Sequence, residues 1–185
     1  MRWLITIGAV SGLVCPAVVP ISSRAAEPAR SVKPVLIWSG IGSAAAKASA
    51  SRSRSQTEWQ AIWFRNTGRV GVEDPLAAPP EVDFSTHMVV ALFHGDGWAA
   101  NAGPKVAEVL EEADCLRVRY RPRWISFVFP PDPETEAMLK KATRGYAFVL
   151  LPSSKKRIVL EEDAQVEKGA PPVWKERHRI AAASD

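Results

Sequence analysis

The sequence predicts a mainly β (α+β) protein, with an antiparallel sheet or a small β-sandwich and one packed α-helix near residues 56–66. Three observations lead to this prediction. Short apolar runs recur along the chain and are separated by turn-forming residues. One segment carries the capping signal and the apolar spacing of an amphipathic helix. No crossover helix separates successive apolar runs, as a parallel βαβ arrangement would require.

Residues 1–25 have the pattern of a cleavable secretory signal peptide. Arg2 precedes an uncharged apolar stretch, and Ser23 and Ala25 place small side chains at the positions that signal peptidase recognises. The sequence therefore predicts an exported protein, periplasmic or secreted, with no stable membrane insertion after cleavage. The alternative is a protein anchored in the membrane by an uncleaved signal segment, which the prolines of this stretch disfavour.

The chain that remains after cleavage is long enough for one domain. Residues 26–34 are predicted as a flexible arm, residues 35–165 as the β domain, and residues 166–185 as a Pro-rich, charged C-terminal extension. The full chain has a net charge of +4 with acidic and basic residues interspersed, which argues against nucleic acid as a partner. Cys115 is the only cysteine left after cleavage, so an intramolecular disulfide is excluded.

The first part of the domain is predicted to contain a strand, a loop and the start of the helix. Val35–Trp38 is a compact apolar run and is predicted as the first strand. Residues 43–54 lack an apolar period and are predicted as a loop that buries nothing. Ser55 and Glu58 fit a capping box, in which each side chain accepts a bond from a free backbone N–H, so a helix is expected to begin there.

The apolar stripe of this helix predicts that it packs on a sheet. Trp59, Ile62 and Trp63 are three and four residues apart, so they lie on one helical face. Two tryptophans on such a stripe are typical of a core. The helix is expected to end near Asn66–Gly68, where a glycine follows the last periodic residues.

The rest of the domain is predicted to be mostly strand. Met88–Phe93 is apolar at every position, which is typical of a central strand with both faces covered. Tyr146–Leu151 and Arg157–Leu160 have a hairpin-like spacing and are predicted to pair antiparallel. Further strands are predicted at Val106–Leu110, at Leu116–Tyr120, which Pro122 ends, and at Trp124–Phe129. Surface connections are predicted at residues 70–80 and 98–104, and one or two helical turns at Glu134–Lys141.

The sequence offers few groups for catalysis. His87 and His94 flank one predicted strand on opposite faces, so they cannot share a metal ion without a bulge. His178 lies in a charged segment that is expected to be solvated. No glycine-rich phosphate loop and no zinc-ligand spacing occurs. The sequence therefore predicts no catalytic residue, no metal site and no cofactor, and the weaker enzymatic alternative is a hydrolase that uses the His94–Asp96 loop.

The loop at residues 96–103 is a candidate for binding a partner. It places Asp96, Trp98 and Asn101 beyond the end of a buried strand, where binding loops commonly lie. Trp98 is a large aromatic residue among small ones, and no apolar period requires its burial. The alternatives are that the segment is a plain turn that ends the strand, and that Trp98 folds back as a lid on the core.

The arginine face of the strand at Leu116–Tyr120 is the second candidate. Arg117 and Arg119 alternate with apolar residues, so they share one face of the strand. This face either binds an acidic partner or prevents the pairing of an exposed strand edge, and the sequence does not separate the two. Cys115 has the same parity and is either an inert thiol or, if the arginines lower its pKa, a reactive one.

Several segments occur in an order that matches a known family. They are Trp38–Ile41, Glu58–Trp63, Pro80–Phe84, Met88–Gly95 and Tyr146–Pro152. Together they resemble the C-terminal domain family of the protease complex subunit PrcB, over residues 35–161. The resemblance implies an exported accessory domain, associated in its namesake with stabilising an extracellular protease. The loop after the glycine departs from the family's Thr-Gly-Gly-Tyr-like segment, since it is Asp96–Gly103 here.

The leading functional interpretation is an exported, non-enzymatic binding or accessory module that stabilises or assembles a partner protein, such as an extracellular protease. It depends on the small catalytic inventory and on the resemblance. The alternative is a structural component of the cell envelope that docks through residues 170–185.

Overall fold

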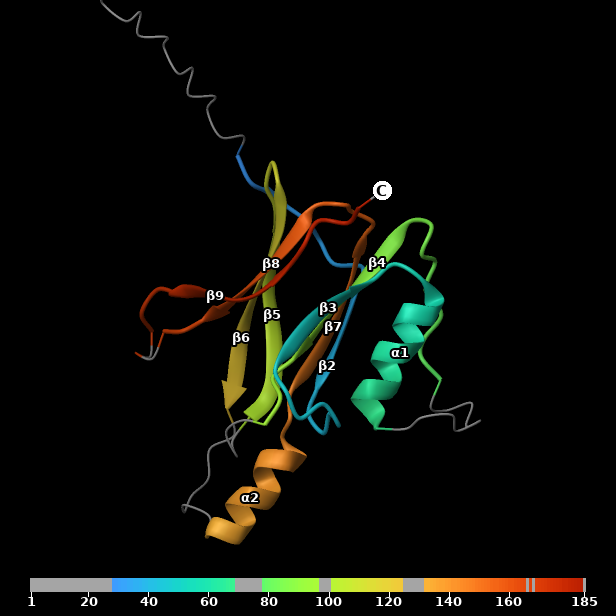
Figure 1. Ribbon diagram of the computed structural model, residues 1–185. Helices are drawn as coiled ribbons and strands as arrows, with labels where there is room; N and C mark the ends of the chain where they lie inside the picture. The colour runs from blue at the N-terminus through green and yellow to red at the C-terminus, as the bar shows by residue number, and fades with distance from the viewer. Residues whose placement is uncertain are drawn as a thin grey trace, which may run out of the picture.

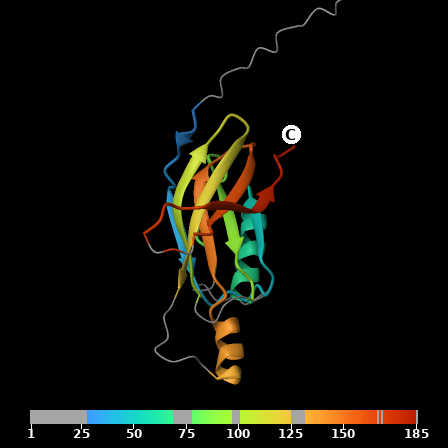
Figure 2. The same ribbon diagram turned by 90° about the vertical axis from the view of Figure 1, so that its left-hand side faces the viewer.

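The computed structural model describes residues 28–68, 78–96, 101–124, 132–165, 167 and 169–184. These residues form two β-sheets packed face to face (Figures 1 and 2). Helix α1 (Gln56–Thr67) covers the outer face of one sheet, and helix α2 (Pro133–Ala142) projects from one end of the sandwich. The predicted mainly β sandwich with one packed helix near residues 56–66 is therefore confirmed.

The larger sheet, sheet A, has five strands in the order β1-β5-β6-β8-β9. They are β1 (Arg30–Ser31), β5 (Asn101–Glu111), β6 (Cys115–Trp124), β8 (Arg157–Asp163) and β9 (Trp174–Ile180). Neighbouring strands run antiparallel except β6 and β8, which are parallel.

The smaller sheet, sheet B, has four strands in the order β2-β7-β4-β3, all antiparallel. They are β2 (Leu36–Gly40), β7 (Tyr146–Pro152), β4 (His87–Phe93) and β3 (Ser49–Ser53). Among the described strands, β2 and β3 therefore form the two edges of this sheet.

The core has an inner layer between the sheets and an outer layer beneath α1. Strand β4 contributes to both. Its residues Met88, Val90 and Leu92 face sheet A, and the alternate residues Val89, Ala91 and Phe93 face α1. This arrangement confirms the prediction that the run at residues 88–93 is a central strand with both faces covered.

The local signals of α1 are confirmed at both ends. The Ser55 hydroxyl accepts a bond from the Glu58 N–H at 3.3 Å, and Gly68 ends the helix in the left-handed conformation at φ 68°. The Glu58 carboxylate accepts from the Arg54 N–H, one residue before the position that a capping box predicts. Trp59 is fully buried and donates from Nε1 to the Pro80 carbonyl at 2.9 Å. Trp63 is half-buried against the same layer.

The domain extends beyond the expected limits of 35–165 at both ends. Strand β1 lies within the predicted flexible arm, residues 26–34, and pairs with β5. Strand β9 lies within the predicted C-terminal extension, residues 166–185, and pairs with β8. Neither strand carries an apolar run, and both lie at the edges of sheet A, where charged side chains disfavour the pairing of a further strand.

The segment at residues 43–54 is not a loop that buries nothing. It contains β3, which pairs with β4, and it buries Ser43, Ala45 and Ser53. Small side chains allow its backbone to lie close to the neighbouring strand and helix, so burial occurs without an apolar pattern.

The predicted hairpin of residues 146–151 and 157–160 is wrong. Strand β7 lies in sheet B and β8 in sheet A, so the connection at residues 153–156 crosses from one sheet to the other. Strand β8 pairs instead with β6, in parallel, and with β9. A short connection between two apolar runs fits a crossing between packed sheets as well as it fits a hairpin.

Two boundaries also differ from the prediction. Strand β6 continues past Pro122 to Trp124, because the parallel pairing with β8 ends at Tyr120 and only β5 pairs with it there. Strand β5 begins at Asn101, inside the expected connection at residues 98–104.

Some predictions fall outside the described residues: the signal peptide, most of the connection at residues 70–80, Trp98 and the predicted strand after Trp124. In the part of the chain described, no helix has the length and apolar content needed to cross a bilayer.

Candidate functional site

The arginine face lies on the outer surface of sheet A, in the middle of the sheet. Leu116, Val118 and Tyr120 point into the inner core, so the alternate residues Arg117 and Arg119 point outward. Strand β6 is flanked by β5 and β8. The interpretation of these arginines as guards of an exposed edge is therefore wrong, because β6 has no free edge along this stretch.

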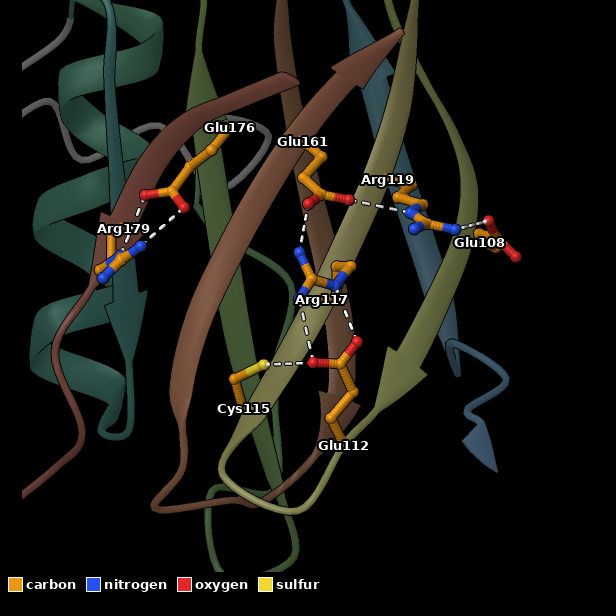
Figure 3. A network of polar contacts seen from close by, with 8 residues as sticks. All are labelled: Glu108, Glu112, Cys115, Arg117, Arg119, Glu161, Glu176 and Arg179. Carbon is orange, nitrogen blue, oxygen red and sulfur yellow. Dashed lines mark hydrogen bonds and ion pairs between the residues drawn. The ribbon is translucent and has the colours of Figure 1, made fainter. Parts of the chain in front are cut away.

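Carboxylates from the neighbouring strands and turn engage both arginines (Figure 3). Arg117 donates from Nε and Nη2 to the two oxygens of Glu112, each at 2.9 Å, and from Nη1 to Glu161. Arg119 donates to Glu161 at 2.9 Å and to Glu108 at 2.8 Å. Positive and negative groups thus alternate across the sheet. We call this row of five side chains the charge ladder: Glu112, Arg117, Glu161, Arg119 and Glu108.

The charge ladder favours the ionised forms of Glu112 and Arg117. The hydrogen bonds from Arg117, followed by that from Cys115, lower the pKa of Glu112 from 4.5 to about 2. The same pairing raises the pKa of Arg117. An acidic partner at this face would have to displace carboxylates that the chain itself supplies, and the exchange would gain little.

One arginine of the charge ladder, Arg119, and the neighbouring Arg121 also contact an aromatic ring at the edge of the sheet. The guanidinium groups of Arg119 and Arg121 lie 5.2 and 5.9 Å from the ring centre of Trp174, and Arg121 also pairs with Asp163 at 3.2 Å. Strand β9 is therefore attached to the sheet by side chains as well as by its backbone.

Glu112, Asp114 and Cys115 form the one group among the described residues whose potential metal-ligand atoms lie close together, within 4.8 Å of one another. The Cys115 thiol donates to Glu112 Oε2 at 3.1 Å, and the same carboxylate also accepts two hydrogen bonds from Arg117. Burial, together with the hydrogen bond to Glu112, raises the pKa of Cys115, so the arginines do not make it a reactive thiolate. A cation here would compete with Arg117, so the contacts support a structural role.

Asp96 anchors its loop to the body of the domain. Its N–H donates to the Ala46 carbonyl at 2.8 Å, and its carboxylate accepts from Arg144 Nε at 2.6 Å. Gly95 has φ 70°, and a Cβ there would lie 2.4 Å from the Ala48 nitrogen, so only glycine fits this approach. Trp98 and the side chain of Asn101 lie outside the described residues, and the backbone of Asn101 pairs with Trp124 at the start of β5.

His94 and His178 enter a partly buried polar cluster that the sequence did not indicate. The His94 ring lies 5.6 Å from the ring of Tyr120, and His178, on β9, pairs with Leu160 of β8 instead of lying in a solvated tail. Glu162 accepts from Arg177 at 2.8 Å and interacts electrostatically with both histidines. Burial, the largest cause, lowers the pKa of His94 and of His178.

The edge of sheet B at β2 exposes an apolar patch that sequence reasoning missed. The patch consists of Val35, Leu36, Ile37 and Ile41, with exposed fractions of 56%, 47%, 39% and 43%. The other exposed large apolar residues among those described are Met138 and Val173. The sequence predicts a strand from the apolar run here, but it contains no signal that this strand lies at an edge.

No family model matches this chain, and no curated protein and no solved structure is significantly similar to it.

Proposed function

We propose that this protein is an exported, non-enzymatic accessory module that binds a partner protein. One observation carries the proposal: four exposed apolar side chains are concentrated within residues 35–41, on one strand edge. Singly scattered exposed apolar residues are ordinary on protein surfaces, whereas several on one short edge segment favour an interaction site. This surface is therefore a better candidate for partner binding than the arginine face or Asp96.

The contacts of the polar candidates support the same proposal. Arg117 and Arg119 are neutralised by carboxylates of this chain, and Asp96 is bound by Arg144. These groups stabilise the fold, so among the candidate surfaces in the described part of the chain we favour the apolar patch. The signal-peptide pattern and the resemblance to the PrcB C-terminal domain family support export and an accessory role.

Affinity purification of the tagged full chain from envelope and extracellular fractions tests the proposal. We expect one protein to be retained in near-stoichiometric amount, and reciprocal purification with that protein as bait to recover this chain. The matched control is an unrelated exported β-sandwich with the same tag. If no fraction yields a protein above this control, the binding function is wrong.

Sequencing of the amino terminus of the exported chain tests export separately. We expect cleavage after Ala25, which gives a chain that begins at Ala26. An intact Met1 in a membrane fraction would instead support the anchored alternative.

A further inference from the structure

The described sheets end in four edge strands, and three of them are protected. Strand β9 carries Lys175, Glu176 and Arg177 in succession, and charged side chains disfavour the addition of another strand. Strand β1 has only two residues. At β3, Arg52 reaches out to the carbonyls of Lys156 and Ala181, both at 2.9 Å.

Strand β2 lacks each of these protections. It contains no charged residue and no proline, and it pairs on one side only, with β7. At the C-terminal end of β2 there is no room for an added strand, because the backbone of β5 lies against it. A Cβ on Gly103 of β5 would lie 2.4 Å from the Gly40 carbonyl oxygen. The open part of the edge is therefore the half from Val35 to Trp38.

The open half exposes both faces of sheet B. Ile37 pairs with Val149, which belongs to the inner core, and Leu36 pairs with Leu150, which belongs to the layer beneath α1. Cross-strand partners point to the same face, so Ile37 and Leu36 end two different apolar layers. Both remain partly exposed. One added strand with apolar residues at successive positions would cover both layers.

The chain segment that carries this edge has one charge, and it is positive. Lys33 precedes β2 and is exposed, and residues 32–42 contain no acidic residue. Lys105 and Glu108 of β5 pair with Arg121 and Arg119, so both belong to the outer face of sheet A and do not set the charge of the β2 edge. An incoming strand with a carboxylate next to Lys33 would complement this charge.

From this geometry we infer that β2 is a docking edge for strand addition. The occupant is an extended segment of a partner protein, apolar at successive positions and with an acidic residue at the end next to Lys33, which pairs with Val35–Trp38 as a further strand of sheet B. The inference rests on the proposed binding function and specifies its surface and the chemistry of the partner. A second copy of this chain fits less well, because its β2 would bring the same lysine and no carboxylate.

Photochemical crosslinking tests the chemistry of the occupant. A photoreactive phenylalanine analogue replaces Leu36 in the full exported chain, and the matched control carries it at Val173, which is also exposed but lies outside β2. We expect the probe at position 36 to capture one partner segment that is apolar at successive positions with Asp or Glu at one end. Capture of β2 from a second copy, of a polar or helical segment, or of nothing beyond the control would overturn the inference.

Substitution at the edge gives the second readout. Ile37→Lys places a charge on the edge and should reduce partner retention at least about tenfold, while Val173→Lys should leave retention unchanged. The charge reversal Lys33→Glu, at an exposed position, should also reduce retention at low salt, while Lys105→Glu, on the outer face of sheet A, should leave retention unchanged. If the wild-type chain retains a partner and all these variants retain it equally, the edge inference is wrong and the binding function stands. If the wild-type chain retains no partner, the binding function itself is wrong.

Discussion

Single carboxylates hold the outer face of sheet A together, and Glu112 does so from the turn between β5 and β6. It accepts two bonds from Arg117 and one from the Cys115 thiol. Its folded-state pKa, about 2, lies well below the ordinary value of 4.5. The contribution of this group to stability is therefore fully present above pH 4.5 and is lost as the pH falls from there toward 2.

The substitution Glu112→Gln tests this role. We expect the free energy of unfolding at neutral pH to fall by ~1–2 kcal/mol, after allowance for solvent screening, and the acid-side loss of stability to become shallower. Urea denaturation at neutral pH and near pH 3 measures both effects. Glu176→Gln is the control, since Glu176 pairs with Arg179 within an edge strand. An unchanged acid profile for Glu112→Gln would contradict the assignment.

The two buried histidines predict a second pH dependence. Burial lowers the pKa of His94 and of His178 below 6.5, so the unfolded chain binds more protons than the folded one as the pH drops below that value. Tyr120, Glu162 and Arg177 are the polar groups around them, and the attraction of Glu162 offsets part of the effect.

The expected result is a loss of unfolding free energy as the pH falls below about 6.5, and a weaker loss in His94→Gln. Urea denaturation midpoints across this range are the measurement. His87→Gln, at the opposite end of β4, serves as the matched control and should keep the wild-type profile. Equal profiles for His94→Gln and wild type would show that His94 does not titrate differently in the fold.

Among the elements, α1 is the one whose stability is simplest to test. Trp59 is fully buried and its ring lies 4.9 Å from that of Phe148. We expect Trp59→Ala to cost about 3–5 kcal/mol through cavity formation, and Ser55→Ala about 1 kcal/mol through the lost cap. Gln60→Ala, at an exposed position of the same helix, should cost less than about 0.5 kcal/mol. A denaturation midpoint unchanged by Trp59→Ala would mean that α1 is not docked.

An element could be predicted from the sequence when the interactions that form it are close together along the chain. The helix could be predicted because its cap, stripe and terminal glycine are local, and β4 because its apolar run is continuous. The partners of β7 and β8 could not, since pairing across sheets leaves no trace in a short connection. Leu36 and Ile37 were predicted in a strand, but their exposure depends on where β7 and β5 place that strand. The charge ladder depends on β8 lying beside β6, which sequence spacing did not indicate.

At the scale of the whole molecule, sheet A is bordered by the first and the last described strands, β1 and β9. A chain truncated to residues 35–165 would lose both. We expect it to unfold at clearly lower urea concentration than a chain of residues 28–184. The reason is that β9 packs Ile180 against the inner core and Trp174 against Arg119 of the charge ladder. Equal midpoints for the two chains would contradict a structural role for the borders.

This placement of β1 and β9 also affects the timing of folding. Ribosomes and translocation channels release a polypeptide from its amino terminus, and sheet A cannot be completed until residue 180 has emerged. Strand β1 cannot pair until β5 has emerged, and the outer edge of β8 cannot pair until β9 has emerged. A pairing as distant along the sequence as that of β1 with β5 forms slowly. If residues 1–25 direct secretion, the nascent chain would remain unfolded, and so able to thread through a channel, during most of its transit.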